Sequence, residues 1–416
     1  MPEPQPVIVP DAAAAAPRVL GHPGLVAFLA SRSFSSLGFQ IQAVAIGWNA
    51  YQMTHRPLTL GLIGLAQFLP MLALVFVSGQ VADRFDRRRV AIICQGVEML
   101  CGLGLAFGTF RHLLTPGTIY GIVALFGAAK AFEGPSLQAL LPSLVPPALF
   151  SRAAALSSSL FQTATIVGPS AGGLLYMAGP GIAYLVCAAM FVLAAVAMSV
   201  VRLEQPLRPR GPVSLATVFG GLAFIWSRPK ILGAISLDLF AVLLGGATAL
   251  LPVYALDILH GSPLALGLLR ASPAIGALAM SVLLARRPIT GRAGPLMFGS
   301  VALFGAATIV FGLSRSLPLS IAAMAVLGAA DVVSVVVRST LVQMNTPEEM
   351  RGRVSAVNLL FIVTSNQLGE FESGSLAALI GTTPAVVAGG IGTLVVAALW
   401  MRLFPSLRRL ERLEDA

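Results

Sequence analysis

Long apolar stretches separated by short polar ones run through almost the whole chain. Each stretch is about 20 residues long, the length that an α-helix needs to cross a hydrocarbon layer of roughly 30 Å. They lack the alternating polarity over about ten residues that marks the strands of a membrane β-barrel. The pattern therefore predicts an all-α membrane protein with twelve transmembrane helices. The predicted spans are residues 24–51, 58–80, 89–110, 117–138, 153–177, 180–202, 231–256, 263–285, 293–314, 318–341, 353–379 and 384–404.

The amino-acid composition agrees with this interpretation. Of the 416 residues, 56% are hydrophobic and only 11% are charged, too few charges for the surface of a soluble protein of this size. The first residues lack the basic stretch and the apolar core of a signal peptide. We therefore expect residues 1–22 to form a disordered cytoplasmic tail that is not cleaved.

Lysine and arginine residues predict the orientation of the spans. With the N-terminus placed in the cytoplasm, the outer loops hold only Arg56, Arg111 and Arg315, and the other basic residues outside the spans lie on the cytoplasmic side. This asymmetry is the positive-inside pattern, and an even number of spans returns the C-terminus to the cytoplasm. The net charge of +10 is therefore a signal of topology, and no nucleic-acid partner is expected.

The two halves of the chain resemble each other. The stretch RPLTLGLIGLAQFLP at 56–70 returns as SPLALGLLRASPAIG at 262–276, and GAAKAF at 127–132 returns as GAADVV at 328–333. Both repeats recur at an offset of roughly 200 residues, which indicates two copies of one six-helix unit. The predicted parts are a tail at 1–22, an N-terminal half at 23–202, a cytoplasmic linker with a candidate amphipathic helix at 203–230, a C-terminal half at 231–404 and a cytoplasmic tail at 405–416.

The stretch SGQVADRFDRRRV at 78–90 concentrates charge between the second and third spans of a chain that has little charge elsewhere. Together with the two parallel six-helix halves, it resembles the major facilitator superfamily of secondary transporters, whose signature loop reads Gly-x-x-x-Asp-Arg-x-Gly-Arg-Arg/Lys. The matching residues are Gly79, Asp83, Arg84, Arg87 and Arg88. Asp86 stands at the second glycine of the pattern, which leaves the turn geometry open because Asp adopts a left-handed backbone less easily than Gly.

Four further stretches, GWNAYQMT, EGPSLQALLPSLVP, GPSAGGLL and RSTLVQMNTPEEMRGRVSAVN, are similar to the bacterial drug and siderophore exporter branch of that superfamily, which is enterobactin-exporter-like. The resemblance implies that the signature loop latches the two halves on the cytoplasmic side when the cavity faces outward. Asp83 would lie near the N-terminus of the eleventh span, where the helix dipole favours an anion. Arg87 would reach Glu133 at the inner end of the fourth span. The alternative is a positively charged anchor without a gating role.

Ionisable side chains inside the predicted spans are costly and are therefore candidates for function. They are Arg32, Glu98, Lys130, Glu133, Asp238, Arg270, Asp331, Glu370 and Glu372. The resemblance implies that the first, fourth, seventh and tenth spans line a central cavity, and most of these residues lie in those spans. Glu98 lies in a span expected at the periphery and receives no role, and Arg270 is expected to snorkel outward.

The repeat aligns Lys130 of the first half with Asp331 of the second, and Arg32 with a position close to Asp238. We expect these residues to form ion pairs across the cavity in at least one conformation. The pairs would break and re-form as the two halves move. The alternative is that Lys130 pairs with Glu133, three residues along the same helix.

The fifth span contains GPSAGGLL at 168–175, in which small residues permit close helix approach and a proline bends the helix. The residues are Gly168, Pro169, Gly172 and Gly173. The resemblance implies that this element seals the outer side, and plain helix packing is the alternative. The second half has GEFESGSL at the corresponding place, so the two outer gates are expected to differ.

These observations predict a secondary active transporter of the bacterial inner membrane, most simply a monomeric, proton-coupled exporter of a small amphipathic molecule such as a siderophore or an antibiotic. Export rests on the resemblance alone, so import on the same fold stays open, as does a sensor that does not transport. Proton coupling needs a carboxyl that can be protonated when it is desolvated, and Asp238, Asp331 and Glu370 are the candidates.

Enzyme activity is not expected, because the four histidines lie in the tail or in outer loops and no catalytic residues gather in one place. No metal site or cofactor is predicted, and the glycine-rich motif that binds nucleotide phosphates is missing. An ion gradient, most simply of protons, would drive transport. The expected partners are the small-molecule substrate and membrane lipid.

Overall fold

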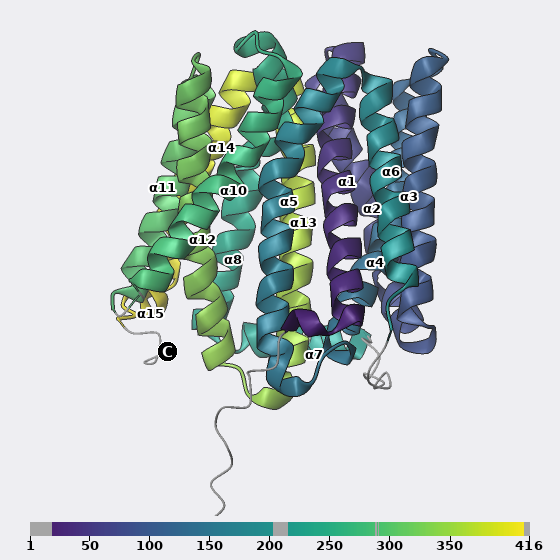
Figure 1. The fold of residues 1–416 in the computed structure, drawn as a ribbon. Coiled ribbons are helices and arrows are strands. Elements are labelled where there is room, and N and C mark those ends of the chain that lie inside the picture. The colour runs from purple at the N-terminus through teal and green to yellow at the C-terminus, as the bar shows by residue number, and fades with distance from the viewer. Residues whose placement is uncertain (1–18, 203–214, 288, 290, 412–416) are drawn as a thin grey trace, which may run out of the picture.

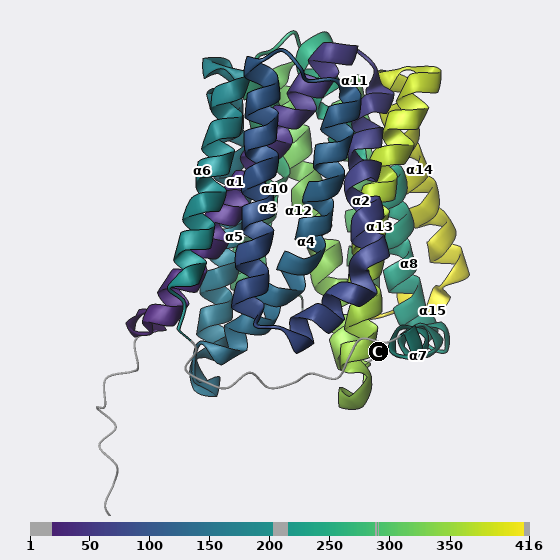
Figure 2. The ribbon, with the colours of Figure 1, turned by 90° about the vertical axis from the view of Figure 1, so that its right-hand side faces the viewer.

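The computed structural model describes residues 19–202, 215–287, 289 and 291–411, and it is a bundle of long helices that run side by side (Figures 1 and 2). Every apolar stretch that was predicted as a span is helical over most of its length. The helices of the first half are α1 (Pro23–Thr54), α2 (Pro57–Arg84), α3 (Arg87–Phe110), α4 (Pro116–Leu140), α5 (Phe150–Ala178) and α6 (Pro180–Ser199).

The second half begins with a span that is not one continuous α-helix. It consists of α8 (Pro229–Leu244), the 3-10 turn η4 (Ala247–Leu250), α9 (Leu251–Val253) and a π-helical turn η5 (Tyr254–Ile258). The remaining helices are α10 (Pro263–Arg286), α11 (Ala293–Leu313), α12 (Leu317–Met344), α13 (Glu348–Ile380), α14 (Thr382–Leu403) and α15 (Pro405–Arg408). The span predicted at residues 231–256 is present, with a break at Gly245 and Gly246.

Proline determines where many of these helices begin. A proline at the first helical position loses no hydrogen bond, because the N–H groups of the first turn have no partner within the helix. The residues in this position are Pro23, Pro57, Pro116, Pro180, Pro229 and Pro263. Their places in the sequence explain why the predicted starts of these helices agree with the structure to within a few residues.

Eight helical segments in the described part of the chain are long and apolar enough to cross a membrane, and the number is nine if a bent pair is one span. The bent pair joins residues 116–143 to residues 147–178 at an angle of 116°. α1 and α13 lie outside this set, because polar side chains such as Gln42 in α1 and Glu370 in α13 lower their mean hydropathy. The count of twelve spans therefore stays a prediction.

Helices pack on one another both within and between the two predicted halves. In the first half α3 packs on α6 and α2 packs on α4, and in the second half α10 packs on α12 and α11 packs on α14. The halves meet along two long seams, where α5 packs on α10 and α2 packs on α13. These two seams are related by the repeat, because α5 and α13 are the fifth helices of their halves and α10 and α2 are the second.

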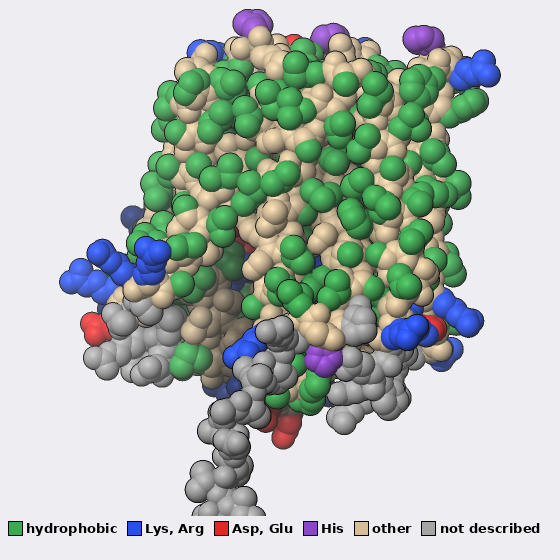
Figure 3. Space-filling model, in the orientation of Figure 1, with side chains coloured by type: hydrophobic (Ala, Val, Ile, Leu, Met, Phe, Trp, Pro, Cys, Tyr) green, Lys and Arg blue, Asp and Glu red, His purple; other side chains and the backbone are tan. Residues whose placement is uncertain are grey.

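Helix α7 (Leu215–Trp226) lies across one end of the bundle, where it packs on α13 and α8 (Figures 1 and 2). We call this the α7 end and the opposite one the far end. Figure 3 shows most lysine and arginine side chains at the α7 end, the distribution expected of a cytoplasmic side. Phe219 and Trp226 of α7 are 64% and 70% exposed, as an amphipathic helix at a membrane surface requires. Residues 203–214 of the predicted linker lie outside the described residues.

Candidate functional site

Glycine contacts close the first seam at the far end. A methyl group on Gly173 of α5 would lie 2.4 Å from the carbonyl oxygen of Pro263, and one on Gly267 of α10 would lie 2.5 Å from the carbonyl oxygen of Pro169. The backbones of the two halves therefore touch where only glycine fits. The other two glycines of the motif pack within the first half, Gly168 on Gln40 and Gly172 on Ile41.

The second seam is closed in the same manner. A methyl group on Gly374 of α13 would lie 2.8 Å from the Cα atom of Gly61 in α2. The hydroxyl of Tyr51 in α1 also donates a hydrogen bond to Asp257 in η5, which joins the halves near the far end. Gly374 takes the place in this seam that Gly173 has in the first, and the expected difference between the two outer gates stays a prediction.

A cavity of about 310 Å³ lies between the halves on the α7 side of the first seam. Its position follows from the direction of the helices: Gln162 and Thr165 of α5 precede Gly173, and Pro273 and Ala274 of α10 follow Gly267. The break in the seventh span, residues 245–248, forms part of the wall. Figure 3 shows the surface hollowed at the α7 end. The cavity is therefore closed toward the far end.

The walls of this cavity are mostly apolar and hold one charged side chain among the described residues, Asp331 of α12. Gln162 donates from Nε2 to the carbonyl oxygen of Ala274 over 3.1 Å, across the seam. Asn366 of α13 adds a second amide. Asp331 forms no ion pair with any residue in the described ranges, so its carboxyl faces the cavity without a cation.

A buried ion pair adjoins the cavity in the second half. Arg338 of α12 lies 2.9 Å from Asp238 of α8, with 5% and 9% of their side chains exposed, and it also donates to Asn358 of α13 over 3.2 Å. Asp238 and Asp331 line one small cavity together. Arg338 is not among the residues that the sequence predicts for the site. Its spacing of seven residues from Asp331, two turns along the same helix face, was the available signal.

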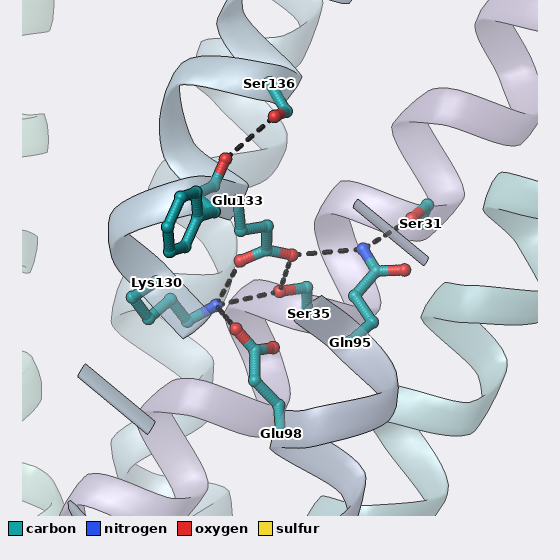
Figure 4. A network of polar contacts seen from close by, with 8 residues as sticks. Ser31, Ser35, Gln95, Glu98, Lys130, Glu133 and Ser136 are labelled. Carbon is teal, nitrogen blue, oxygen red and sulfur yellow. Dashed lines mark hydrogen bonds and ion pairs between the residues drawn. The ribbon is translucent and has the colours of Figure 1, made fainter. Parts of the chain in front are cut away.

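A larger network of charged side chains lies inside the first half (Figure 4). Lys130 of α4 lies 2.5 Å from Glu133 and 3.1 Å from Glu98 of α3. Glu133 also accepts hydrogen bonds from Ser35 of α1 at 2.8 Å and from Gln95 of α3 at 3.0 Å. Glu98, to which the sequence assigned no role, is fully buried in this network. The signal for it was Gln95, which lies three residues earlier on the same face of α3.

The ion pairs predicted across the cavity are not formed in this conformation, so they stay a prediction for another one. Lys130 pairs with glutamates of its own half, which is the alternative that the sequence left open, and Asp238 pairs with Arg338. The guanidinium of Arg32 lies 5.8 Å from the ring centre of Phe161 in α5. The physical reason is proximity: α3 and α4 pack on each other, whereas Lys130 and Asp331 belong to different halves.

A second cavity of about 110 Å³ lies between α1, α2 and α13. Arg270 of α10 and Glu370 of α13 both line it, so the expectation that Arg270 snorkels outward is wrong. A methyl group on Gly64 of α2 would lie 2.7 Å from Oε2 of Glu370, which shows how closely this carboxyl packs on the first half. The Oε1 atom of Gln42, also in the wall, is buried without a hydrogen-bond partner.

The signature loop has a defined turn. Asp86 has an extended backbone (φ −61°, ψ 110°) and caps α3 by accepting from the backbone N–H of Arg88 at 3.0 Å. No left-handed residue is needed at this position, so aspartate replaces the family's glycine without strain. The hydrogen bond from the Arg88 side chain is the main reason that the pKa of Asp86 lies below its ordinary value.

The remaining residues of the loop contact the first half. Arg87 donates to the carbonyl oxygen of Ala139 over 3.1 Å, and Arg88 donates to that of Val201 over 3.0 Å. Glu133 lies six residues before Ala139, roughly 9 Å along α4, so Arg87 meets the end of α4 and not this carboxyl. Gly79 and Arg84 lie on α2, and the side chain of Asp83 is outside the described structure.

Comparisons with known proteins agree with this architecture. The chain matches the transmembrane secretion effector family over residues 24–415. It is 27% identical over 395 residues to the enterobactin exporter EntS of Citrobacter koseri, with 93% of each chain covered. The corresponding identity to EntS of Escherichia coli is 26%, again with 93% of each chain covered.

Two solved structures show the same fold. A bacterial homologue of the human lysosomal transporter Spinster, inward-facing and unoccupied, has a TM-score of 0.74 at 14% identity and covers 94% of this chain and 99% of its own. A bacterial homologue of the iron transporter ferroportin, inward-facing, has a TM-score of 0.70 at 16% identity and covers 94% and 100%. The chain is therefore a membrane transporter, not an enzyme, and it belongs to the transmembrane secretion effector family of the major facilitator superfamily.

Proposed function

We propose that this transporter is a proton-coupled exporter of a small amphipathic molecule in the bacterial inner membrane, and that it works by alternating access. The observation that carries the proposal is the cavity of about 310 Å³ between the halves. Its volume is at the lower end of ligand cavities, which begin at about 300 Å³. Its wall includes a broken helix, the feature that marks substrate sites in secondary transporters.

The chemistry of the cavity supports a particular kind of substrate. Val242, Phe304 and Leu327 can remove an apolar body from water. Asp331 offers a carboxyl without a protein cation, so the polar end of the substrate is a cation or a hydrogen-bond donor. A substrate rich in hydroxyl groups would need many more amide and aromatic partners than these walls provide.

The direction of transport is proposed from the relatives, because the geometry of the cavity serves import equally well. The EntS proteins of Citrobacter koseri and Escherichia coli are exporters of enterobactin. The identity of 27% supports export as the direction. The substrate itself follows from the cavity, whose single carboxyl suits a cationic or donor group.

The test compares the metabolites that cells release. A deletion strain is complemented with the wild type, with Asp331→Asn or with Glu348→Gln, each with and without a protonophore, and medium and cell contents are measured by mass spectrometry. Glu348 is the matched control, since its carboxyl is 89% exposed at the beginning of α13. We expect at least one metabolite to leave wild-type and Glu348→Gln cells and to stay inside Asp331→Asn cells and inside cells treated with protonophore.

Two results would contradict the proposal. If a metabolite accumulates inside wild-type cells and is lost from the medium, the protein is an importer. If release in all strains is alike with and without the protonophore, proton-coupled export is wrong.

A further inference from the structure

The network around Lys130 contains more negative than positive charge. Glu98 and Glu133 both face one ammonium, at 3.1 Å and 2.5 Å. Two ionised carboxylates and one ammonium leave one negative charge in excess. We call Glu98, Lys130 and Glu133 the buried triad (Figure 4).

The triad is well separated from water. Glu98 is 0% exposed and Glu133 is 3% exposed, and 19% of the Lys130 side chain is accessible. Three aromatic rings, those of Phe39, Phe126 and Phe191, lie 5.5 to 5.7 Å from the ammonium nitrogen. An excess charge in such an apolar site is costly unless something neutralises it.

The charged and titratable groups around the triad do not cancel this excess by contact. Arg32 of α1 lies over the ring of Phe161 and acts on Glu133 from a distance, without an ion pair to the triad among the described residues. Cys94 and Cys101 of α3 and Cys187 of α6 are buried free thiols. The charged residues of α2 lie only in its last turn at the α7 end.

The two carboxyl groups have unequal partners. Glu133 accepts from the Lys130 ammonium, from the Ser35 hydroxyl and from the Gln95 amide, so three donors stabilise its ionised form. Neither oxygen of Glu98 has a well-aligned hydrogen-bond partner. Its carboxyl lies 3.1 Å from the Lys130 ammonium and beside the carboxyl of Glu133. A proton that neutralises the triad therefore costs fewer hydrogen bonds on Glu98 than on Glu133.

We infer that Glu98 is the proton-carrying residue of this transporter, and that the buried triad alternates between a neutral state with a protonated Glu98 and a state with one negative charge. This inference rests on the proposed proton coupling. The step breaks the O–H bond of the Glu98 carboxyl, and the proton leaves by the accessible side of Lys130 while both electrons stay on the carboxylate.

The triad is connected to the space between the halves. Phe39 and Phe126, two of the rings around Lys130, also line the cavity of about 110 Å³. Ser35 of α1 bonds both Lys130 and Glu133. A change in the charge of the triad therefore acts on α1, whose next turns form part of the cavity wall.

The first experiment needs no substrate. The purified full chain is placed in vesicles of phosphatidylethanolamine and phosphatidylglycerol, and the infrared C=O stretch of protonated buried carboxyls is followed as the pH is changed. We expect Glu98→Gln to reduce the intensity of this band by the contribution of one carboxyl. Glu372→Gln changes a carboxyl outside the triad and should leave the contribution of Glu98 unchanged. A titrating band that survives intact in Glu98→Gln but loses a share in Asp331→Asn overturns the inference.

Glu98→Gln leaves Lys130 and Glu133 as a balanced pair, so we expect the variant to fold, and size-exclusion chromatography tests this. Glu98→Asp, which keeps a carboxyl, should restore a band at a shifted position. A second readout separates the inference from the proposed function. Once a metabolite is identified, we expect Glu98→Gln to exchange it across the vesicle membrane at the wild-type rate. Under a proton gradient, accumulation of the metabolite by Glu98→Gln should be at least tenfold lower than by the wild type. Wild-type accumulation by the variant would refute the role of Glu98 and leave the proposed exporter intact.

Discussion

The glycine contacts of the first seam exist only while the far end is closed. A substitution at these glycines should therefore destabilise that conformation alone. In Gly173→Ala the new methyl carbon would lie 2.4 Å from the carbonyl oxygen of Pro263, against 3.4 Å or more in ordinary contact. The obstacle is backbone of the other half, so no side chain can rotate away. Overpacking of this kind typically costs about 1–3 kcal/mol.

This cost applies to the closed far end and is absent when the halves separate there. We therefore expect Gly173→Ala to raise the ratio of open to closed far ends by a factor of about 5 to 150. Gly276→Ala is the matched control, because its methyl group would lie 1.8 Å from the carbonyl oxygen of Ala325. α10 and α12 belong to the same half, so this variant should lose thermal stability without opening the far end.

The assay is a distance measurement between spin labels on the two halves. Leu113, before α4, and Leu379, near the end of α13, are 61% and 82% exposed and lie on opposite halves. The three native cysteines are buried, so introduced cysteines at these places should react selectively. An unchanged distance distribution in Gly173→Ala, together with the same loss of stability as in Gly276→Ala, would show that the seam is plain packing.

Three further predictions concern charged groups. Asp238→Asn leaves the buried guanidinium of Arg338 unpaired, and we expect it to lower the free energy of unfolding by about 3–5 kcal/mol. Adding Arg338→Met should recover most of that loss, as measured by thermal unfolding. A double variant that is no more stable than Asp238→Asn contradicts the pairing. Lys130→Met leaves two carboxyls without their cation and should lower the melting temperature more than Glu98→Gln does, so equal losses would argue against the charge imbalance of the triad. Asp86→Ala removes the cap of α3 and should cost about 1 kcal/mol. Because the folded-state pKa of Asp86 is lowered, its contribution is fully present above the ordinary carboxyl pKa of about 4 and is lost as the pH falls through the lowered pKa. A difference between wild type and Asp86→Ala that disappears at neutral pH is therefore the contradicting result.

The positions of the helices could be read from the sequence because they depend on local chemistry. Apolar length determines which stretches can cross a membrane, and prolines such as Pro57 and Pro263 determine where helices start. The repeat indicated the two halves because each copy of the six-helix unit has to bury the same helix faces and therefore keeps a similar sequence. The break at Gly245 and Gly246 was missed, although a Gly-Gly pair inside an apolar span was a visible signal.

The candidate site was predicted in part. Asp331 was expected in the cavity and lines it, and Lys130 was recognised as a buried charge that needs a partner. The predicted partners do not meet in this conformation, because the repeat relates residues by symmetry and symmetry-related residues need not touch. Lys130 instead meets Glu98, whose helix α3 packs on α4.

The sequence by itself determined that this chain is a helical membrane protein in two related halves, which residues are charged inside it, and which superfamily it resembles. Those properties follow from hydrophobic length, proline positions and motifs, all of which are local along the chain. The tertiary structure alone decided which charge meets which, that Gly374 closes the second seam as Gly173 closes the first, and that the cavity is shut toward the far end. Each of these depends on distances between helices that lie far apart in the sequence, and a buried charge is satisfied by its nearest neighbour in space, whatever its place in the chain.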